Sequence, residues 1–168
     1  RRSSDLFKLS FSKIIDEFLE AKSFGIITRP VILGPLSFLY LSKSTSSKFN
    51  KFNLLNKLIP IYKQIFKLLK DFGAEWIQVD EPILCLDLEK NIKNKFRSTY
   101  KILGKESPKI LLTSYFSSIY PNYDLLKIIN VDGIHFDLIN TKDKDLNKIL
   151  NNFPKDKFFS AGLVNGRN

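Results

Sequence analysis

The segment EWIQVDEP, residues 75–82, decides the fold of this chain. Its apolar part is short and ends in two carboxylates and a proline, as is typical of a buried parallel strand followed by a loop. Side chains alternate across a strand, so Ile77 and Val79 share one side while Gln78 and Asp80 share the other. We therefore expect one apolar face covered by helices and one partly polar face that is available for chemistry.

Four similar runs, each short and rich in apolar residues, occupy 30–35, 109–115, 133–138 and 158–164. Helical patterns lie before and between the five runs, at 12–24, 54–72, 88–103, 124–129 and 144–153. This alternation predicts parallel strands joined by crossover helices, and hence an α/β fold. A doubly wound sheet and a (β/α)8 barrel both satisfy it. No Gly-x-Gly-x-x-Gly loop follows any of the runs, which disfavours a dinucleotide-binding sheet.

Three residues give local signals for where helices begin, bend and end. Ser12 is placed to cap the start of the first helix. Pro60 interrupts the longest helical pattern and should kink or restart that helix. Gly73 should end it as a C-cap. The polar stretch 44–53 is the one loop-like insertion in the sequence. The sequence shows no boundary that would divide the chain into two domains.

The net charge of +10 over 168 residues raises the question of nucleic-acid binding. Of the 27 basic residues only five are arginine, and the lysines are scattered over helix-like segments without an arginine-rich or aromatic-interleaved patch. The chain is also rich in Ile, Phe and Asn, a bias that an AT-rich genome produces. A solvated, lysine-rich surface is therefore favoured over a nucleic-acid interface. A membrane partner is disfavoured too, since no apolar run approaches the roughly 20 residues of a membrane helix.

Both ends of the sequence look like internal positions of a longer polypeptide. The chain contains no methionine, and it stops at Asn168 immediately after a strand-like run that would need neighbours to cover it. We therefore expect residues 1–168 to be a single, incomplete domain. The first residues lead into an amphipathic stretch rather than a signal peptide. The single cysteine, Cys85, fits a reducing compartment.

The candidate site residues stand at the carboxyl ends of the predicted strands: Asp80, Glu81, His135 and Asp137. Barrel enzymes build their sites at that end, so we take these four as candidates that face the barrel lumen. The alternative, given equal weight for Asp80 and His135, is that they are polar core groups that are buried but paired. Asp80 and Glu81 are successive residues and should point opposite ways, so one could face the lumen while the other fixes the following loop.

Neither a metal centre nor a cysteine nucleophile is supported by the sequence. One histidine and one cysteine, His135 and Cys85, do not make the three- or four-ligand set that zinc requires. The apolar neighbours of Cys85 favour a packed, inert thiol over a nucleophile.

Several segments resemble those of one known family, in the family's own order. The segment RPVILGPLSF at 29–38 resembles "KPVLLGPVTF", and EWIQVDEP at 75–82 resembles "EWVQIDEP". Further matches are FKLS at 7–10 to "FKLT", LLNKLIPIY at 54–62 to "LL..LLPVY", TSYF at 113–116 to "TTYF", GIHFDL at 133–138 to "GLHVDLV", and SAGLVNGRN at 160–168 to "SAGLINGRN". The chain thus resembles the cobalamin-independent methionine synthases over nearly its whole length.

This resemblance implies two facing (β/α)8 (TIM) barrels in one cytoplasmic polypeptide, of which this chain is part of the amino-terminal barrel, with about five parallel strands and outer helices. It implies transfer of a methyl group from 5-methyltetrahydropteroyltriglutamate to homocysteine, with zinc held by the carboxy-terminal barrel. The family's zinc ligands, homocysteine site and basic folate contacts fall outside residues 1–168, so no catalytic residue is carried onto this chain.

Two rival interpretations accompany this one. The first treats the chain as a non-catalytic barrel module that supports folate binding and the catalytic barrel. The second, an independent barrel enzyme of the decarboxylase-like relatives, would need eight strands, whereas five are visible in the sequence.

Overall fold

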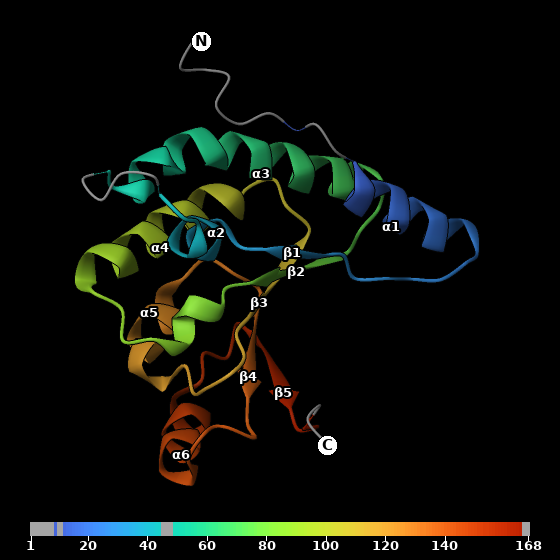
Figure 1. Ribbon diagram of the computed structural model, residues 1–168. Coiled ribbons are helices and arrows are strands. Elements are labelled where there is room, and N and C mark those ends of the chain that lie inside the picture. The colour runs from blue at the N-terminus through green and yellow to red at the C-terminus, as the bar shows by residue number, and fades with distance from the viewer. Residues whose placement is uncertain (1–8, 10–11, 45–48, 166–168) are drawn as a thin grey trace.

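The computed structural model describes residue 9 and residues 12–44 and 49–165 (Figure 1). Most of FKLS at 7–10, residues 45–48 of the polar insertion and the last three residues of SAGLVNGRN lie outside the described residues. A five-stranded sheet is built from β1 (Val31–Leu33), β2 (Trp76–Asp80), β3 (Lys109–Thr113), β4 (Gly133–Asp137) and β5 (Phe158–Gly162). Every neighbouring pair is parallel, and the spatial order follows the chain order.

This strand order decides between the two folds that the sequence left open. A doubly wound sheet reverses its strand order at a switch point, whereas the wall of a barrel adds each strand beside the previous one. The order β1-β2-β3-β4-β5 is that of a barrel wall. The predicted fold class, an α/β partial barrel with five parallel strands and outer helices, is therefore confirmed.

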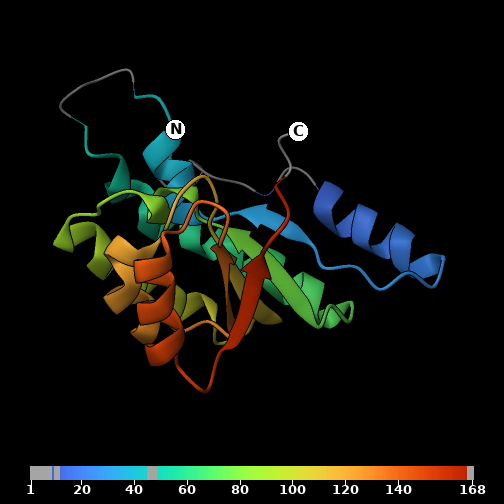
Figure 2. The same cartoon turned by 90° about the horizontal axis from the view of Figure 1, so that it is seen from below.

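The helices lie on one side of the sheet (Figure 1). They are α1 (Lys13–Ser23), α2 (Pro35–Leu41), α3 (Leu55–Asp71), α4 (Lys90–Leu103), α5 (Tyr123–Ile128) and α6 (Asp143–Asn152). Figure 2 shows α1 and α6 at opposite ends of the twisted sheet. Strand residues that face the helices are at most 1% exposed: Ile77, Val79, Ile110, Leu112, Ile134 and Phe136. The core therefore fills the space between sheet and helices, and the other face remains half-exposed. No described helix is long and apolar enough to cross a bilayer.

The element boundaries agree closely with the sequence, apart from one helix, α2. Strand β2 lies within the segment 75–82, and α1, α3, α4, α5 and α6 each begin and end within two residues of their predicted positions. Helix α3 continues through Pro60 without the predicted restart, although the proline cannot donate the backbone hydrogen bond that this position of the second turn would otherwise make. Helix α2 was not predicted. Ser12 is the N-cap of α1, but its side chain donates to Asp16 and not to the helix backbone. Gly73 follows the C-cap Phe72 with φ of +90°, as expected for a left-handed residue there.

A buried carboxylate joins the end of β2 to two helices. Glu81 is fully buried, and it accepts hydrogen bonds from the backbone N–H groups of Leu36 (3.2 Å) and Ser37 (2.7 Å) in the first turn of α2. The hydroxyl of Tyr100, on α4, donates to the same carboxylate at 2.9 Å. Donors at a helix start favour a negative charge there. Burial acts in the opposite direction and is the larger effect, so it raises the pKa of Glu81 to about 7.

Gly34, the N-cap of α2, leaves the space that Glu81 needs. Its φ of −70° and ψ of 152° are open to any residue, so glycine is not required for backbone conformation. A Cβ at this position would lie 2.2 Å from the Glu81 carboxyl group. Glycine is therefore required for close approach, and the Gly-Pro pair of RPVILGPLSF and the Asp-Glu-Pro of EWIQVDEP form one structural unit.

Three lysines bind the carboxyl ends of helices. The Nζ of Lys22 donates to the C-cap carbonyl of α3 at 2.7 Å, and that of Lys51 donates to the C-cap carbonyl of α2 at 2.8 Å. Lys157, whose side chain is 7% exposed, donates to the C-cap carbonyl of α5 at 2.9 Å. A cation at a helix C-terminus satisfies orphan carbonyls and complements the helix dipole. Part of the lysine excess therefore serves the fold.

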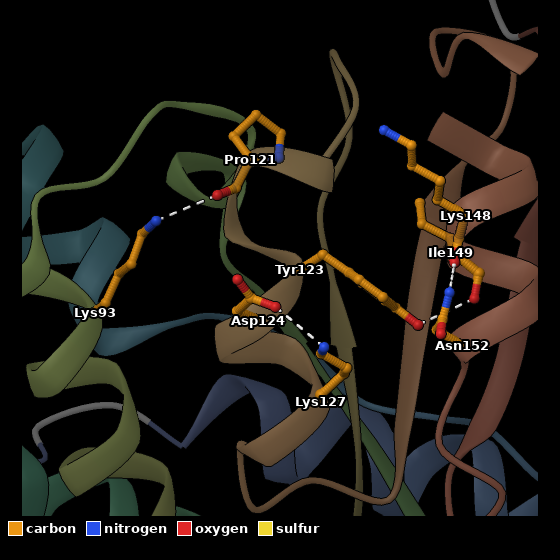
Figure 3. Close-up of polar contacts among 8 residues, drawn as sticks. All are labelled: Lys93, Pro121, Tyr123, Asp124, Lys127, Lys148, Ile149 and Asn152. Carbon is orange, nitrogen blue, oxygen red and sulfur yellow. Dashed lines mark hydrogen bonds and ion pairs between the residues drawn. The ribbon is translucent and has the colours of Figure 1, made fainter. Parts of the chain in front are cut away.

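Polar contacts also link α4, α5 and α6 to one another (Figure 3). Lys93 Nζ donates to the carbonyl of Pro121 at 3.2 Å, which links α4 to the turn before α5. The hydroxyl of Tyr123 donates to the carbonyl of Ile149 at 3.0 Å, which links α5 to α6. Consecutive outer helices are thus held by directional bonds in addition to apolar packing.

We predict that replacing Glu81 by glutamine removes a pH dependence of stability. The folded pKa of about 7 lies above the ordinary 4.5, so the folded state holds the proton more tightly. This contribution to stability is fully present below pH 4.5 and is lost as the pH rises to about 7. The loss should be on the order of 3 kcal/mol at most, by the linkage between pKa and free energy. The measurement is the free energy of unfolding in urea across this range, and an equal slope in the variant would contradict the prediction.

We predict that Gly34→Ala destabilises the protein through Glu81 alone. The added methyl must displace a buried carboxylate, at a cost of roughly 1–3 kcal/mol, as for other overpacked sites. In a Glu81→Ala background the same substitution should cost little, because the clashing group is gone. A double-mutant cycle of urea unfolding measures this coupling. Equal costs in both backgrounds would show that Gly34 is required for another reason.

Candidate functional site

A row of polar side chains crosses the half-exposed face of the sheet near the strand carboxyl ends. The strand register pairs Leu33 with Asp80, Asp80 with Thr113, Thr113 with His135, and His135 with Ser160. Side chains of register partners lie on the same face of a sheet. The structure therefore places Asp80 and His135 on the same face, two strands apart with Thr113 between them, on the side away from the helices.

Asp80 is held by neighbouring polar groups on this face. Its carboxylate accepts from Gln78 Nε2 at 2.8 Å and from the hydroxyl of Tyr115 at 3.4 Å. Gln78 in turn accepts from the Arg29 guanidinium at 2.9 Å. Arg29, Gln78, Asp80 and Tyr115 thus form a continuous hydrogen-bonded chain that fixes the orientation of the Asp80 carboxylate.

His135 is half-buried and faces the neighbouring strand β5. Its Nδ1 lies 2.9 Å from Ser160 Oγ, and a Cβ at Gly162 would lie 2.8 Å from its Nε2. Gly162 therefore makes room for the imidazole. Burial lowers the pKa of His135, and the positive charge of Arg29 lowers it further, whereas Asp137 and Asp80 oppose the shift. The ring is accordingly neutral near pH 7.

Asp137 lies beyond His135 at the end of β4, beside a cavity. Its carboxylate accepts from the backbone N–H of Asn140 at 3.1 Å and from Asn140 Nδ2 at 2.6 Å, so the loop after β4 is folded around it. The cavity holds about 390 Å³ and is lined by Tyr115, Phe116, His135, Asp137, Ile139, Asn140, Gly162, Val164 and Asn165. A concave site with convergent polar groups is the usual form of a small-molecule site.

Phe116 forms part of the cavity wall with an uncommon backbone conformation. Its φ is +83°, and its side chain is 62% exposed. Its ring meets that of Tyr115 edge-on, with 4.7 Å between centroids. Positive φ in a bulky residue is costly and is concentrated at functional sites.

Glu81 does not join the other three candidate residues. Successive residues point to opposite faces of a strand, and Asp80 takes the open face. Glu81 therefore turns to the helix side, where α2 and α4 surround it. The expectation that Glu81 faces the lumen is corrected accordingly.

The described residues contain no group of three or more His, Cys, Asp or Glu that could hold a metal ion. The zinc that the resemblance implies does not fit these residues, and we assign no step to it here. Cys85 is partly exposed at the end of a 3-10 turn, Pro82–Cys85, and burial raises the pKa of its thiol. A raised pKa leaves little thiolate near neutral pH.

Sequence reasoning missed several residues of this site. Tyr115 is two residues beyond Thr113 and shares its parity, so alternation pointed to it. Asn140 stands three residues after Asp137, one more than the spacing of an Asx turn, so that local rule did not point to it. The left-handed backbone of Phe116 has no signal in the sequence.

We predict that the pKa of His135 lies below its ordinary 6.5, since burial and Arg29 both disfavour the imidazolium form. His135 is the one histidine of the chain, so its Cε1 proton is identified directly in an NMR titration. Asp137→Asn should lower the pKa further and Arg29→Gln should raise it. Asp71→Asn, on the exposed end of α3, is the control and should not change it. A titration midpoint at or above 6.5 in the unaltered protein would refute the prediction.

Comparison with known proteins gives a consistent result. The family model described as "Cobalamin-independent synthase, N-terminal domain" matches residues 2–168. A 5-methyltetrahydropteroyltriglutamate–homocysteine methyltransferase of Xylella fastidiosa (strain M23) is 47% identical over 163 residues, which are 96% of this chain and 21% of that protein. The corresponding protein of Buchnera aphidicola subsp. Cinara cedri (strain Cc) is 44% identical over 166 residues, which are 99% of this chain and 22% of that protein.

A solved structure shows the same fold. The B12-independent methionine synthase from Shewanella sp. W3-18-1, solved in complex with selenomethionine, matches 92% of this chain and 59% of that chain with a TM-score of 0.63 at 16% identity. The chain spans about a fifth of the length of the curated relatives it matches. With a family model that matches nearly every residue, the chain belongs to the cobalamin-independent synthase family, in its N-terminal domain.

Proposed function

We propose that the polypeptide containing this chain transfers a methyl group from 5-methyltetrahydropteroyltriglutamate to homocysteine and so forms methionine. The observation that carries the proposal is 47% identity over 163 residues to a relative named for that reaction. In this transfer the bond between the methyl carbon and the pteridine nitrogen breaks, and a carbon–sulfur bond forms. The thiol loses a proton, and the nitrogen of the product gains one.

We further propose that residues 1–168 are part of an amino-terminal barrel that the remainder of the polypeptide completes. Two observations support this arrangement. Strands β1 and β5 are the edges of the described sheet, and the side chains of Val31, Leu33 and Phe158 on its open face are 52%, 37% and 61% exposed. Apolar side chains at sheet edges are normally covered by further strands. We also propose that a carboxy-terminal barrel belongs to the same polypeptide and that the protein acts in the cytoplasm, as the family resemblance implies.

Asp80, His135 and Asp137 are proposed to lie on the side of this barrel that faces the substrates and the carboxy-terminal barrel. The support is their common face and the barrel rule that sites occupy the carboxyl ends of strands. Zinc is proposed to be bound by the carboxy-terminal barrel, where it would activate the thiol of homocysteine. A second candidate function, a non-catalytic module that supports folate binding and the catalytic barrel, is favoured by the lack of a metal-ligand group among the described residues.

We predict that residues 1–168 alone do not form methionine, whereas the full-length polypeptide does. The described residues offer no ligand set that could lower the pKa of a thiol, and effective transfer needs both reactants held in line. The assay supplies zinc, homocysteine and methyltetrahydropteroyltriglutamate and measures methionine. Turnover by residues 1–168 above a no-protein control, abolished by Asp80→Asn, would place the chemistry in this chain. No turnover by the full-length protein would refute the proposed reaction.

A further inference from the structure

We propose that the cavity at the strand carboxyl ends binds a small molecule that carries a protonated primary amine on a short apolar or aromatic arm. The cavity, defined above by its lining, has one polar side formed by His135, Asp137 and Asn140 and one apolar side formed by Phe116, Ile139 and Val164. The proposal does not depend on methyl transfer and is tested separately from it.

The described lining of the cavity is acidic, whereas the chain as a whole is basic. The protein carries 27 lysines and arginines against 17 acidic residues, yet no lysine or arginine lines the cavity among the residues described. Asp137 is the acidic residue of the lining, and the groups that donate to it come from the neutral Asn140. No ion pair within the described ranges involves Asp137 or Asp80. A carboxylate that is paired with no cation among the described residues favours a cationic ligand and disfavours an anionic one.

A second, independent observation concerns Thr113. Its side chain is 4% exposed, and its hydroxyl has no hydrogen-bond partner in the described part of the chain. Strand register places it between Asp80 and His135, on the face that leads into the cavity. Buried hydroxyl groups are nearly always bonded, so the unpartnered Thr113 hydroxyl leaves the polar network of this face incomplete next to His135, which lines the cavity. An ammonium group brings three donors and no acceptor, which suits a face rich in acceptors.

The apolar side of the cavity is the reason for proposing an apolar or aromatic arm on the ligand. Phe116, Ile139 and Val164 are 62%, 47% and 90% exposed and surround the opening. Apolar side chains around a polar pocket are covered when a ligand with an apolar part enters. The edge-on pair of Tyr115 and Phe116 offers ring surface to an aromatic arm or to the cation itself.

The test uses the full-length polypeptide and two probes of the same shape, 2-phenylethylamine and 2-phenylethanol, near neutral pH. Isothermal titration should give a dissociation constant for the amine at least about ten-fold lower than that for the alcohol, as expected for a charge-assisted bond. Asp137→Asn should remove this preference and leave the alcohol unchanged. The control Asp71→Asn changes an exposed carboxylate paired with Lys67 and should retain the preference.

Phe116→Ala tests the apolar side of the cavity separately from Asp137. Both probes carry the same aromatic arm, so this substitution should weaken the binding of both by a similar factor. Circular dichroism and urea unfolding verify that each variant is folded. Equal affinity for amine and alcohol would overturn the proposal, since the charge of the Asp137 carboxylate would then contribute nothing to binding. So would an amine preference that survives Asp137→Asn, or no binding of either probe. The methionine assay on the same protein reports the proposed reaction independently of these outcomes.

Discussion

The arrangement of β1, β2, α2 and α4 depends on one buried carboxylate. Glu81 receives donors from the start of α2 and from Tyr100, and no water is needed to satisfy it. Removing a charged acceptor from such a place leaves several buried donors without partners, which is one of the larger costs a single substitution can impose. The close approach also requires glycine at position 34, so two distant segments constrain one another. The hydrogen bonds of Glu81 thereby fix the end of β2, and with it the position of the residue before Glu81.

That residue is Asp80, and strand parity gives the two neighbouring carboxylates different roles. Asp80 takes the open face, where Gln78 and Tyr115 orient it, while Glu81 is locked among helices. Their environments differ accordingly, since full burial raises the pKa of Glu81 to about 7. An Asp-Glu pair in sequence is therefore not a pair in space. One member stabilises the barrel wall so that the other can be presented at its carboxyl edge.

Alternation of short apolar runs with helical patterns was sufficient to predict the strands and most of the helices, because buried parallel strands and amphipathic helices carry distinct periods. Helix α2 could not be found that way. Its sequence, PLSFLYL, is apolar nearly throughout, and the group that caps it, Glu81, comes from 44 residues further along the chain. The same limit applies to the site. Parity placed Asp80, His135 and Asp137 on one face and Glu81 on the other, but the partners that bury Glu81 and the left-handed backbone of Phe116 arise from tertiary contacts that no local pattern records.

The net positive charge of the chain and the local charge at the candidate site have opposite signs. Lys22, Lys51 and Lys157 bind the carbonyl ends of helices, and in the described part of the chain other lysines lie over aromatic rings, as Lys109 does over Trp76. These uses keep cations on the outer helices and at the amino-terminal edge of the sheet. The opposite edge has Asp80 and Asp137 and, within the described lining of its cavity, no lysine or arginine. Because charge interactions weaken quickly with distance in salt, the local carboxylates and not the net charge of +10 dominate the electrostatic environment of this edge.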